Sequence, residues 1–235
     1  MSMKPLTTKI TYLDNFILGI MAGVAIGVGG FLNLLMSACG LKYLGGFLFS
    51  VGLFTVCFFG LHLFTGRVGY VMDNKRSYAL NLFLMYLGNV VGAVGFGYLM
   101  YLTGISKEGG FLYQTVTNVI NSKIIDVGSG VGQSSLRMVI FSFFCGIMVF
   151  LAVDIFKKSK NWFIKVGGLV ICVALFVICG MEHCIADMFY FAINNTYANF
   201  LPCLLAILIA TAGNSLGAIA SRTVVRHIEQ VDKNN

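Results

Sequence analysis

The sequence predicts an all-α membrane protein with six transmembrane helices. Of its 235 residues, 58% are hydrophobic and only 11% are charged, and the mean hydropathy is +0.87. Soluble domains usually have about 25% charged residues. A spanning helix needs about 20 mainly apolar residues, and six windows reach that length. They are residues 15–38, 45–72, 80–103, 136–156, 162–190 and 200–221.

The windows differ in continuity. The first follows a polar segment and is long enough to span, so we expect it to stay in place rather than be cleaved as a signal peptide. The second and fifth are interrupted by GLHLFTG at 60–66 and by GMEHCIADM at 180–188. The third and sixth share the pattern xGNxxGAx, at 87–94 and 212–219. The fourth is continuous. Two broken helices are therefore predicted, the second and the fifth.

The paired interruptions and the shared xGNxxGAx pattern predict a single channel domain over 1–235, built from two repeats of three spans at approximately 12–105 and 130–224. Three spans return the chain on the opposite side, so the second repeat must be inverted, as in aquaporin-like folds. Matching broken helices in inverted repeats indicate a site near the midplane. Non-helical backbone is stable at that depth only where protein or a water-filled cavity satisfies it, so the breaks are expected to line a pathway.

The xGNxxGAx elements have a packing interpretation. Their glycines, spaced i and i+4, allow helices to approach closely. Asn89 and Asn214 are expected to hydrogen-bond the opened backbone at the breaks rather than a substrate.

Lysine and arginine fall mainly on one side of the predicted topology. Because these residues accumulate in cytoplasmic loops, both termini are expected to be cytoplasmic, and the net charge of +7 requires no nucleic-acid partner. The twelve residues on that side are Lys4, Lys9, Arg67, Lys75, Arg76, Lys157, Lys158, Lys160, Lys165, Arg222, Arg226 and Lys233. The four on the other side are Lys42, Lys107, Lys123 and Arg137.

The breaks contain the candidate functional residues. His183 is an ionisable group inside a span, which by default suggests function, and it titrates near neutral pH; the alternative is a neutral histidine that caps loose carbonyls. Thr65 is either a helix cap or a hydrogen-bond donor to a ligand. His62 is either a second protonatable group or a buried histidine with a satisfied hydrogen bond. Glu182 flanks His183, and Asp187 is expected to cap the half-helix that follows.

Enzyme chemistry is not expected. The sequence contains no GxSxG, Walker, strand-linked GxGxxG or HExxH motif. Its seven cysteines lie singly in or beside apolar spans and form no CxxC pair, which is typical of small core residues rather than of a zinc or disulfide framework. We therefore predict no catalytic residues, no metal and no cofactor.

Taken together, GLHLFTG, YLGNVVGA, IMVFLAV, GMEHCIADMF and AGNSLGA resemble the formate/nitrite transporter family over nearly the whole chain, and GxEHxxAxMF is the most specific match. The resemblance implies a six-helix channel with one pore per protomer and a homopentamer in the bacterial inner membrane. It also implies small monovalent anions such as formate, nitrite or hydrosulfide as substrates, with protons.

Carried over by position, the resemblance makes His183 the central pore histidine and Thr65 the threonine of the loop that breaks the second helix. It makes Leu53 and Phe176 the apolar constrictions on either side, with Leu63 and Phe64 accompanying the threonine loop. A bare anion pays a large desolvation penalty in such a constriction, whereas the neutral acid does not. The implied mechanism delivers a proton through the vestibule or through the histidine.

Four positions depart from the family pattern. Gly130 stands where a lysine is usual, Gly146 where an asparagine is usual, His62 for an acid and Asp187 for an asparagine. A missing lysine would remove the positive potential that attracts anions and leave a neutral or pH-switchable vestibule. The alternative function is thus a pore for a neutral or cationic small solute, such as ammonia, hydrogen sulfide or water. A third hypothesis is a membrane scaffold or receptor with a closed pore.

Overall fold

The computed structural model describes residues 11–128, 130–194 and 200–234. Lys4 and Lys9, which entered the orientation argument, lie outside these residues. The described residues form helices and no strand, which confirms the all-α prediction. The α-helices are α1 (Tyr12–Ala38), α2 (Lys42–Phe59), α3 (Ser77–Leu102), α4 (Tyr113–Lys123), α5 (Ser135–Lys158), α6 (Trp162–Ile178), α7 (Cys184–Asn194) and α8 (Phe200–Asn234), with one 3-10 helix, η1 (Val68–Asp73).

Within the described residues, five helices are long and apolar enough to cross a membrane: α1, α2, α3, α5 and α8. The fifth predicted window is divided between two shorter apolar helices, α6 and α7. The second predicted window is divided between α2 and η1. Helix α4 was not predicted, because its mixed polar and apolar residues are not typical of a membrane span.

Both helix breaks begin at a glycine with left-handed backbone. Gly60 follows α2 with φ 69°, and Gly180 follows α6 with φ 67°. Side chains with a Cβ rarely adopt this conformation, so glycine commonly ends a helix in this way. The interruptions in the second and fifth windows are therefore true helix ends, at the positions that the sequence indicated.

Asn89 holds the first break open. Its Nδ2 donates to the carbonyl oxygens of Gly19 (2.8 Å) and His62 (2.9 Å). Its Oδ1 accepts from the backbone N–H of Phe64 (2.8 Å). The side chain is fully buried. Backbone groups that no helix satisfies thus find partners inside the protein.

Asn214 does the same for the second break. Its Nδ2 donates to the carbonyl oxygens of Ser142 and Glu182, both at 2.8 Å. Its Oδ1 accepts from the N–H of Cys184 (2.9 Å). The expectation that the two asparagines bind opened backbone is confirmed.

Glycines allow the long helices to pack closely, as expected. A Cβ added at Gly19 on α1 would lie 2.7 Å from the carbonyl oxygen of Met85 on α3, and one at Gly92 on α3 would overlap the Ile20 carbonyl of α1. On α8, a Cβ at Gly217 would overlap the Phe143 carbonyl of α5. Small residues at such contacts bring the helix backbones together.

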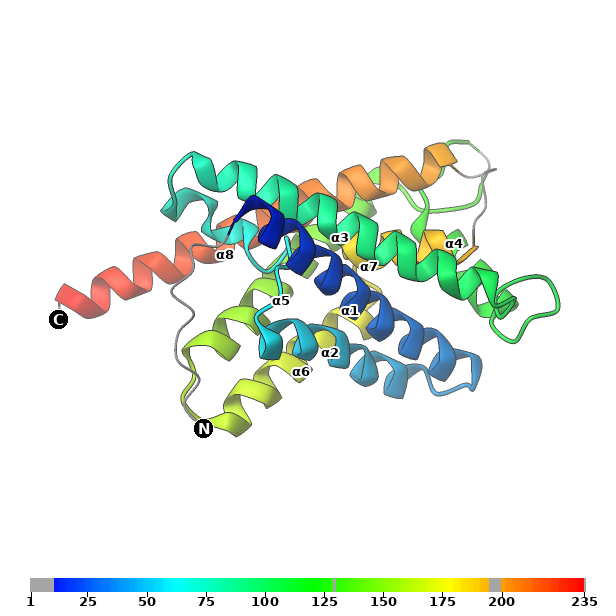
Figure 1. Ribbon diagram of the computed structural model, residues 1–235, viewed down its shortest axis with the longest axis horizontal. Helices are drawn as coiled ribbons and strands as arrows, with labels where there is room; N and C mark the ends of the chain where they lie inside the picture. Colours follow the sequence, from blue (N-terminus) through cyan, green and yellow to red (C-terminus); the bar gives the residue numbers. More distant parts are fainter. Residues whose placement is uncertain (1–10, 129, 195–199, 235) are drawn as a thin grey trace.

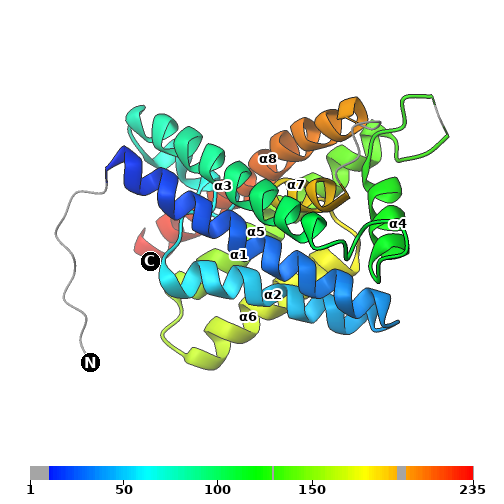
Figure 2. The same cartoon turned by 45° about the vertical axis from the view of Figure 1, so that its right-hand side comes forward.

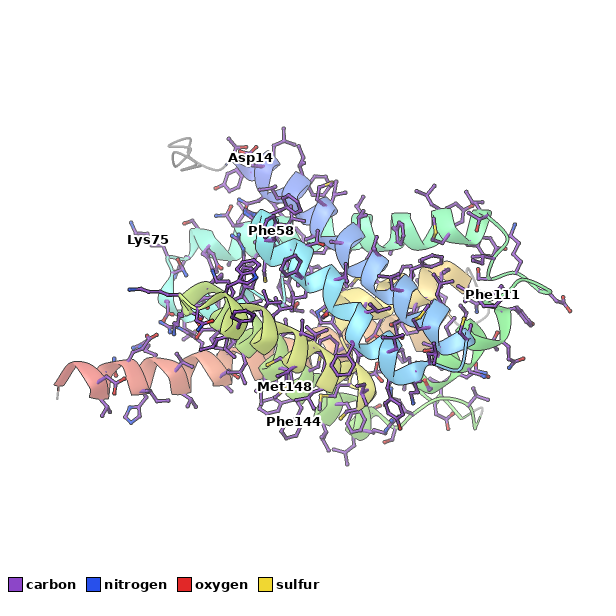
Figure 3. The ribbon with its side chains drawn as sticks, turned by 90° about the horizontal axis from the view of Figure 1, so that it is seen from below. Asp14, Phe58, Lys75, Phe111, Phe144 and Met148 are labelled. Atoms are coloured by element: carbon purple, nitrogen blue, oxygen red, sulfur yellow. The ribbon has the colours of Figure 1, made fainter. Side chains whose placement is uncertain are left out.

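The elements divide between two sides of the molecule. The start of α1 and the end of α8 lie on one side, which we call the termini side, and α4 lies on the other, the α4 side (Figures 1 and 2). Figure 3 places Lys75 on the termini side and Phe111 on the α4 side. The loops that the charge pattern separated therefore do lie on opposite sides.

Replacing Gly92 by alanine should lower the free energy of unfolding by about 1–3 kcal/mol, the usual cost of overpacking, because the new Cβ meets the α1 backbone. Gly95 on the same helix is the matched control, since a Cβ there has no neighbour within 4 Å. Gly95→Ala should therefore change stability by less than about 1 kcal/mol. Thermal denaturation of the purified protein in detergent measures both variants. Equal effects of the two substitutions would contradict close packing at Gly92.

Candidate functional site

The two helix breaks meet through Thr65 and His183. Thr65 Oγ1 lies 2.9 Å from His183 Nε2. Both side chains are buried, with exposed fractions of 0% and 2%. Each residue reaches this point because its helix ends early and the chain continues without helical hydrogen bonds. The structure thus brings together two predicted site residues from opposite halves of the sequence.

The surroundings of the imidazole assign its tautomer. The backbone N–H of Ala186 donates to His183 Nδ1 at 3.2 Å. A ring nitrogen that accepts a hydrogen bond has no proton, so the neutral ring has its proton on Nε2. Nε2–H then donates to Thr65 Oγ1. The hydroxyl hydrogen of Thr65 is left to donate to another acceptor.

A cavity of about 170 Å³ reaches His183 from the α4 side. The Phe176 ring lies against the imidazole, with ring centroids 5.9 Å apart and an angle of 27° between the planes. Phe49 contacts Phe176 edge to face, with centroids 5.7 Å apart. The inner end of the cavity is therefore aromatic around one polar group. Other lining residues are Asn33, Lys42, Val119, Lys123, Asp187 and Tyr190.

One lysine forms salt bridges with two acids in this cavity. Lys123, at the end of α4, places Nζ 2.5 Å from Glu182 Oε2 and 2.9 Å from Asp187 Oδ1. Both acids are buried, each 1% exposed. Burial lowers the pKa of Lys123, but the Asp187 and Glu182 carboxylates outweigh burial and raise its pKa above the ordinary 10.5. The lysine is therefore a fixed positive charge beside His183.

A chain of side chains from the start of α5 supports Glu182. Gln133 Nε2 donates to Glu182 Oε1 at 2.8 Å, and Arg137 Nη1 donates to Gln133 Oε1 at 3.1 Å. Glu182 thus accepts from two donors, whereas the Asp187 oxygens accept no well-directed hydrogen bond from the described residues. Asp187 is the less satisfied of the two acids.

The prediction that the vestibule lacks a lysine is wrong. Gly130 is exposed, and its N–H donates to Asp126 Oδ1 at 3.1 Å. Lys123, seven residues earlier in the chain, supplies the charge instead. A loop with positive φ at Gly128, Gly130 and Gly132 separates Lys123 from α5, and the position at a fixed spacing from His183, Gly130, falls in this loop rather than on the lysine. The sequence did hold a signal, because two acids inside an apolar span require a cation.

The expected cap role of Asp187 is also wrong. Helix α7 begins at Cys184, so Asp187 lies inside its first turn. Its N–H donates to the His183 carbonyl at 2.9 Å, and its carboxylate faces Lys123. The residue contributes charge to the cavity and does not cap the half-helix.

A second cavity, of about 60 Å³, lies on the termini side of Thr65. Leu63 and Gly66, on either side of Thr65 in the chain, line it together with Arg67 and Lys157. His183 lines the cavity on the α4 side. The contact between Thr65 and His183 therefore separates the two cavities.

Three predicted site residues lie away from this contact. Leu53 is buried in α2 and lines neither cavity. The Phe64 ring packs against Tyr86, with centroids 5.0 Å apart. His62 Nδ1 lies 2.8 Å from Asn15 Oδ1 on α1, and it too lines neither cavity. The His62 geometry is that of a buried histidine with a satisfied hydrogen bond, the alternative that the sequence left open.

Comparison with known proteins gives consistent matches. A family model described as formate/nitrite transporter matches residues 5–228. The formate channel FocB of Escherichia coli (strain K12) is 26% identical over 200 residues, which cover 80% of this chain and 68% of the relative. The formate channel FocA of the same strain is 30% identical over 192 residues, covering 75% and 65%. The chain thus spans about two thirds of the length of these relatives.

Solved structures match the fold. A structure described as a pentameric formate channel with formate bound is 25% identical to this chain. The match covers 93% of this chain and 96% of that chain, with a TM-score of 0.72.

Replacing Lys123 by glutamine should destabilise the protein by roughly 3–5 kcal/mol, because removing one partner leaves buried carboxylates without a counter-ion. Adding Asp187→Asn in the same chain should recover part of the loss, since one carboxylate is then gone. Lys107→Gln, at an exposed lysine, is the control. Thermal denaturation in detergent measures all three. If Lys123→Gln were as stable as the wild type, the lysine would not be the counter-ion of this pair.

Proposed function

The chain belongs to the formate/nitrite transporter family, and on that premise we propose that it is a membrane channel or transporter for small monovalent weak-acid anions of the formate, nitrite or hydrosulfide type. The observation that carries the proposal is the buried contact between Thr65 and His183 where the helix breaks meet. A cavity lies on each side of that contact. The relatives described as formate channels support the substrate class.

We also propose the inverted repeat, with α1 to α3 as one half and α5 to α8 as the other, and with α6 and α7 together as the fifth of six spans. The hydrogen bonds of Asn89 and Asn214 support it. Each asparagine donates to one carbonyl of its break, at His62 or Glu182, and accepts from the N–H two residues later. Such equivalence is expected if two halves of the chain share one local structure.

Proton linkage follows from the apolar wall beside His183. The Lys123 ammonium offers a local charged donor to an anion inside the cavity on the α4 side, although Glu182 and Asp187 offset its charge at longer range. Beyond it, Phe176 offers no polar group, so a bare anion would lose its hydration without compensation. An anion that gains one proton passes as the neutral acid and releases the proton on the far side. Each acid molecule that crosses therefore moves one anion and one proton.

His183 is the group that exchanges this proton in our proposal, with Thr65 donating its hydroxyl hydrogen to the substrate. In the tautomer assigned above, Nδ1 accepts the Ala186 N–H. A second proton on the ring must occupy Nδ1, so the Ala186 contact must then open. Proton exchange at His183 is thereby coupled to the first turn of α7.

The alternative function remains a pore for ammonia, hydrogen sulfide, water or another neutral or cationic solute. Its support no longer comes from Gly130, because Lys123 lies in the cavity. It comes from Glu182 and Asp187, two carboxylates that share one ammonium. If both acids are ionised, the cluster has a net negative charge, which favours cations over anions. A membrane scaffold with a closed pore would transport neither weak-acid anions nor these neutral or cationic solutes.

For assembly and location, we propose a homopentamer in a bacterial inner membrane with both termini cytoplasmic. The matched structure is described as pentameric. Exposed apolar side chains on α2, α3 and α5, such as Phe58, Phe83 and Phe144, suit lipid or a neighbouring protomer. The excess of Lys and Arg on the termini side supports the orientation.

In liposomes, His183→Ala should change the pH dependence of formate, nitrite and hydrosulfide uptake as well as its size, because a titrating group is lost. Thr65→Val should reduce uptake roughly fivefold, the equivalent of one hydrogen bond, and leave most of the pH response. Proton uptake measured together with anion uptake tests the one-to-one linkage, and reversal potentials under salt and pH gradients detect any separate transport of bare anions or cations. A His183→Ala protein with the wild-type pH profile would remove the proton role from this histidine. No uptake by the wild type would favour the scaffold.

Phe176→Ala should raise conductance and weaken selectivity, because the aromatic wall beside His183 excludes water and bare ions. Leu53→Ala should do the same if Leu53 also forms a constriction. Phe163→Ala on the same helix as Phe176 is the control, since Phe163 is 85% exposed. Single-channel recording in planar bilayers measures the effect. Loss of stability without leakage would identify Phe176 or Leu53 as a packing residue.

A further inference from the structure

Arg67 and Lys157 lie where an outer and an inner cavity join on the termini side. The outer cavity, of about 480 Å³, is lined by both residues, by Tyr70 and Tyr78, and by the acids Asp154 and Glu229 with their partners Lys158 and Arg222. The inner cavity of about 60 Å³ is also lined by both, and it ends at Leu63. A solute that approaches Thr65 from this side must pass the two cations. The inner volume is about that of two water molecules at roughly 30 Å³ each.

The acids nearest to this junction are already paired. Asp154 Oδ2 lies 2.9 Å from Lys158, which also lies 2.6 Å from Glu229. Asp154 Oδ1 accepts from the Tyr70 hydroxyl. Asp73 and Glu229 pair with Arg222 at 2.5 and 3.1 Å.

Neither Arg67 nor Lys157 forms a salt bridge with an acid among the described residues, and Asp154, which lines the outer cavity with them, is paired with Lys158. Lys157 Nζ lies over the Tyr70 ring, 4.8 Å from its centroid. The backbone of Arg67 is held by hydrogen bonds to the Phe64 carbonyl and from the Tyr78 hydroxyl. Two positive charges therefore line the inner cavity, and its other described lining residues are uncharged.

We propose that Arg67 and Lys157 form an anion-binding site on the termini side of the pore, specific for a small planar anion with two oxygen atoms, such as a carboxylate or nitrite. The guanidinium matches two such oxygens with parallel N–H donors, and the lysine adds a second charge. The small cavity with apolar walls excludes larger anions. The site is separate from Lys123, which lies beyond His183 on the α4 side. The choice of ligand rests on the proposed function.

The electrostatic potential inside the inner cavity can be measured without any transport assay, and it gives a first test of the site. Cys57 lines the same inner cavity, so its rates of reaction with an anionic and a cationic methanethiosulfonate reagent can be compared by peptide mass spectrometry. Arg67→Gln and Lys157→Gln should each slow the anionic reaction and speed the cationic one by up to about fivefold, the order expected for one unit charge about 4 Å away in water, so the ratio of the two rates falls by up to about 25-fold. Arg76→Gln and Lys75→Gln are matched controls at exposed positions and should leave the ratio unchanged. If Cys57 does not react, Leu61→Cys provides a reporter in the same wall.

Binding is tested with the same reporter. Formate should slow the anionic reaction at Cys57 more than chloride does at equal ionic strength, and Arg67→Gln should abolish the difference. An unchanged rate ratio in both charge variants, or formate protection that survives Arg67→Gln, would overturn the site. Uptake of labelled formate by liposomes separates this result from the proposed function. A wild type that takes up no formate but shows protection would keep the site and reject the transport proposal.

Discussion

The structure depends on one constraint: a helix that ends inside an apolar layer must find partners for its free backbone groups within the protein. Water is absent there, and each unsatisfied group would cost several kcal/mol. Asn89 and Asn214 meet this requirement, each with two donated hydrogen bonds and one accepted. Because the breaks are satisfied in this way, Thr65 and His183 are free to face each other.

Charge is distributed unevenly about that contact. On the α4 side, Lys123 is neutralised by two buried acids, so its positive field is small outside the cluster. On the termini side, Arg67 and Lys157 stand without an acid partner among the described residues, and nearby acids are paired elsewhere. The two approaches to His183 therefore present different potentials to a charged solute. A pore with unlike ends favours one direction of entry at low solute concentration.

The features that the sequence predicted are those set by local chemistry. Glycine ends a helix, and asparagine in a GN element offers both a donor and an acceptor to nearby backbone, so both breaks and their supports could be predicted. The meeting of Thr65 with His183 followed from the similarity of the two halves. Glu182 and Asp187 indicated that a cation must lie nearby, but which lysine supplies it, and the roles of Gln133 and of the partner of His62, could not be predicted, because they depend on how far a loop reaches or on which helix packs beside another. Counting residues from His183 leads to Gly130 in the glycine loop before α5, whereas the lysine that meets the acids stands before that loop.

The partners of the two asparagines also bear on biosynthesis. All the backbone groups bound by Asn89 belong to α1 and the first break, and all those bound by Asn214 belong to α5 and the second break. Each half therefore completes its own break as soon as its last helix, α3 or α8, has entered the membrane. The backbone of the first break can therefore be satisfied before the second half is synthesised. The Thr65–His183 hydrogen bond, in contrast, joins the halves, so it can form only after both are in place.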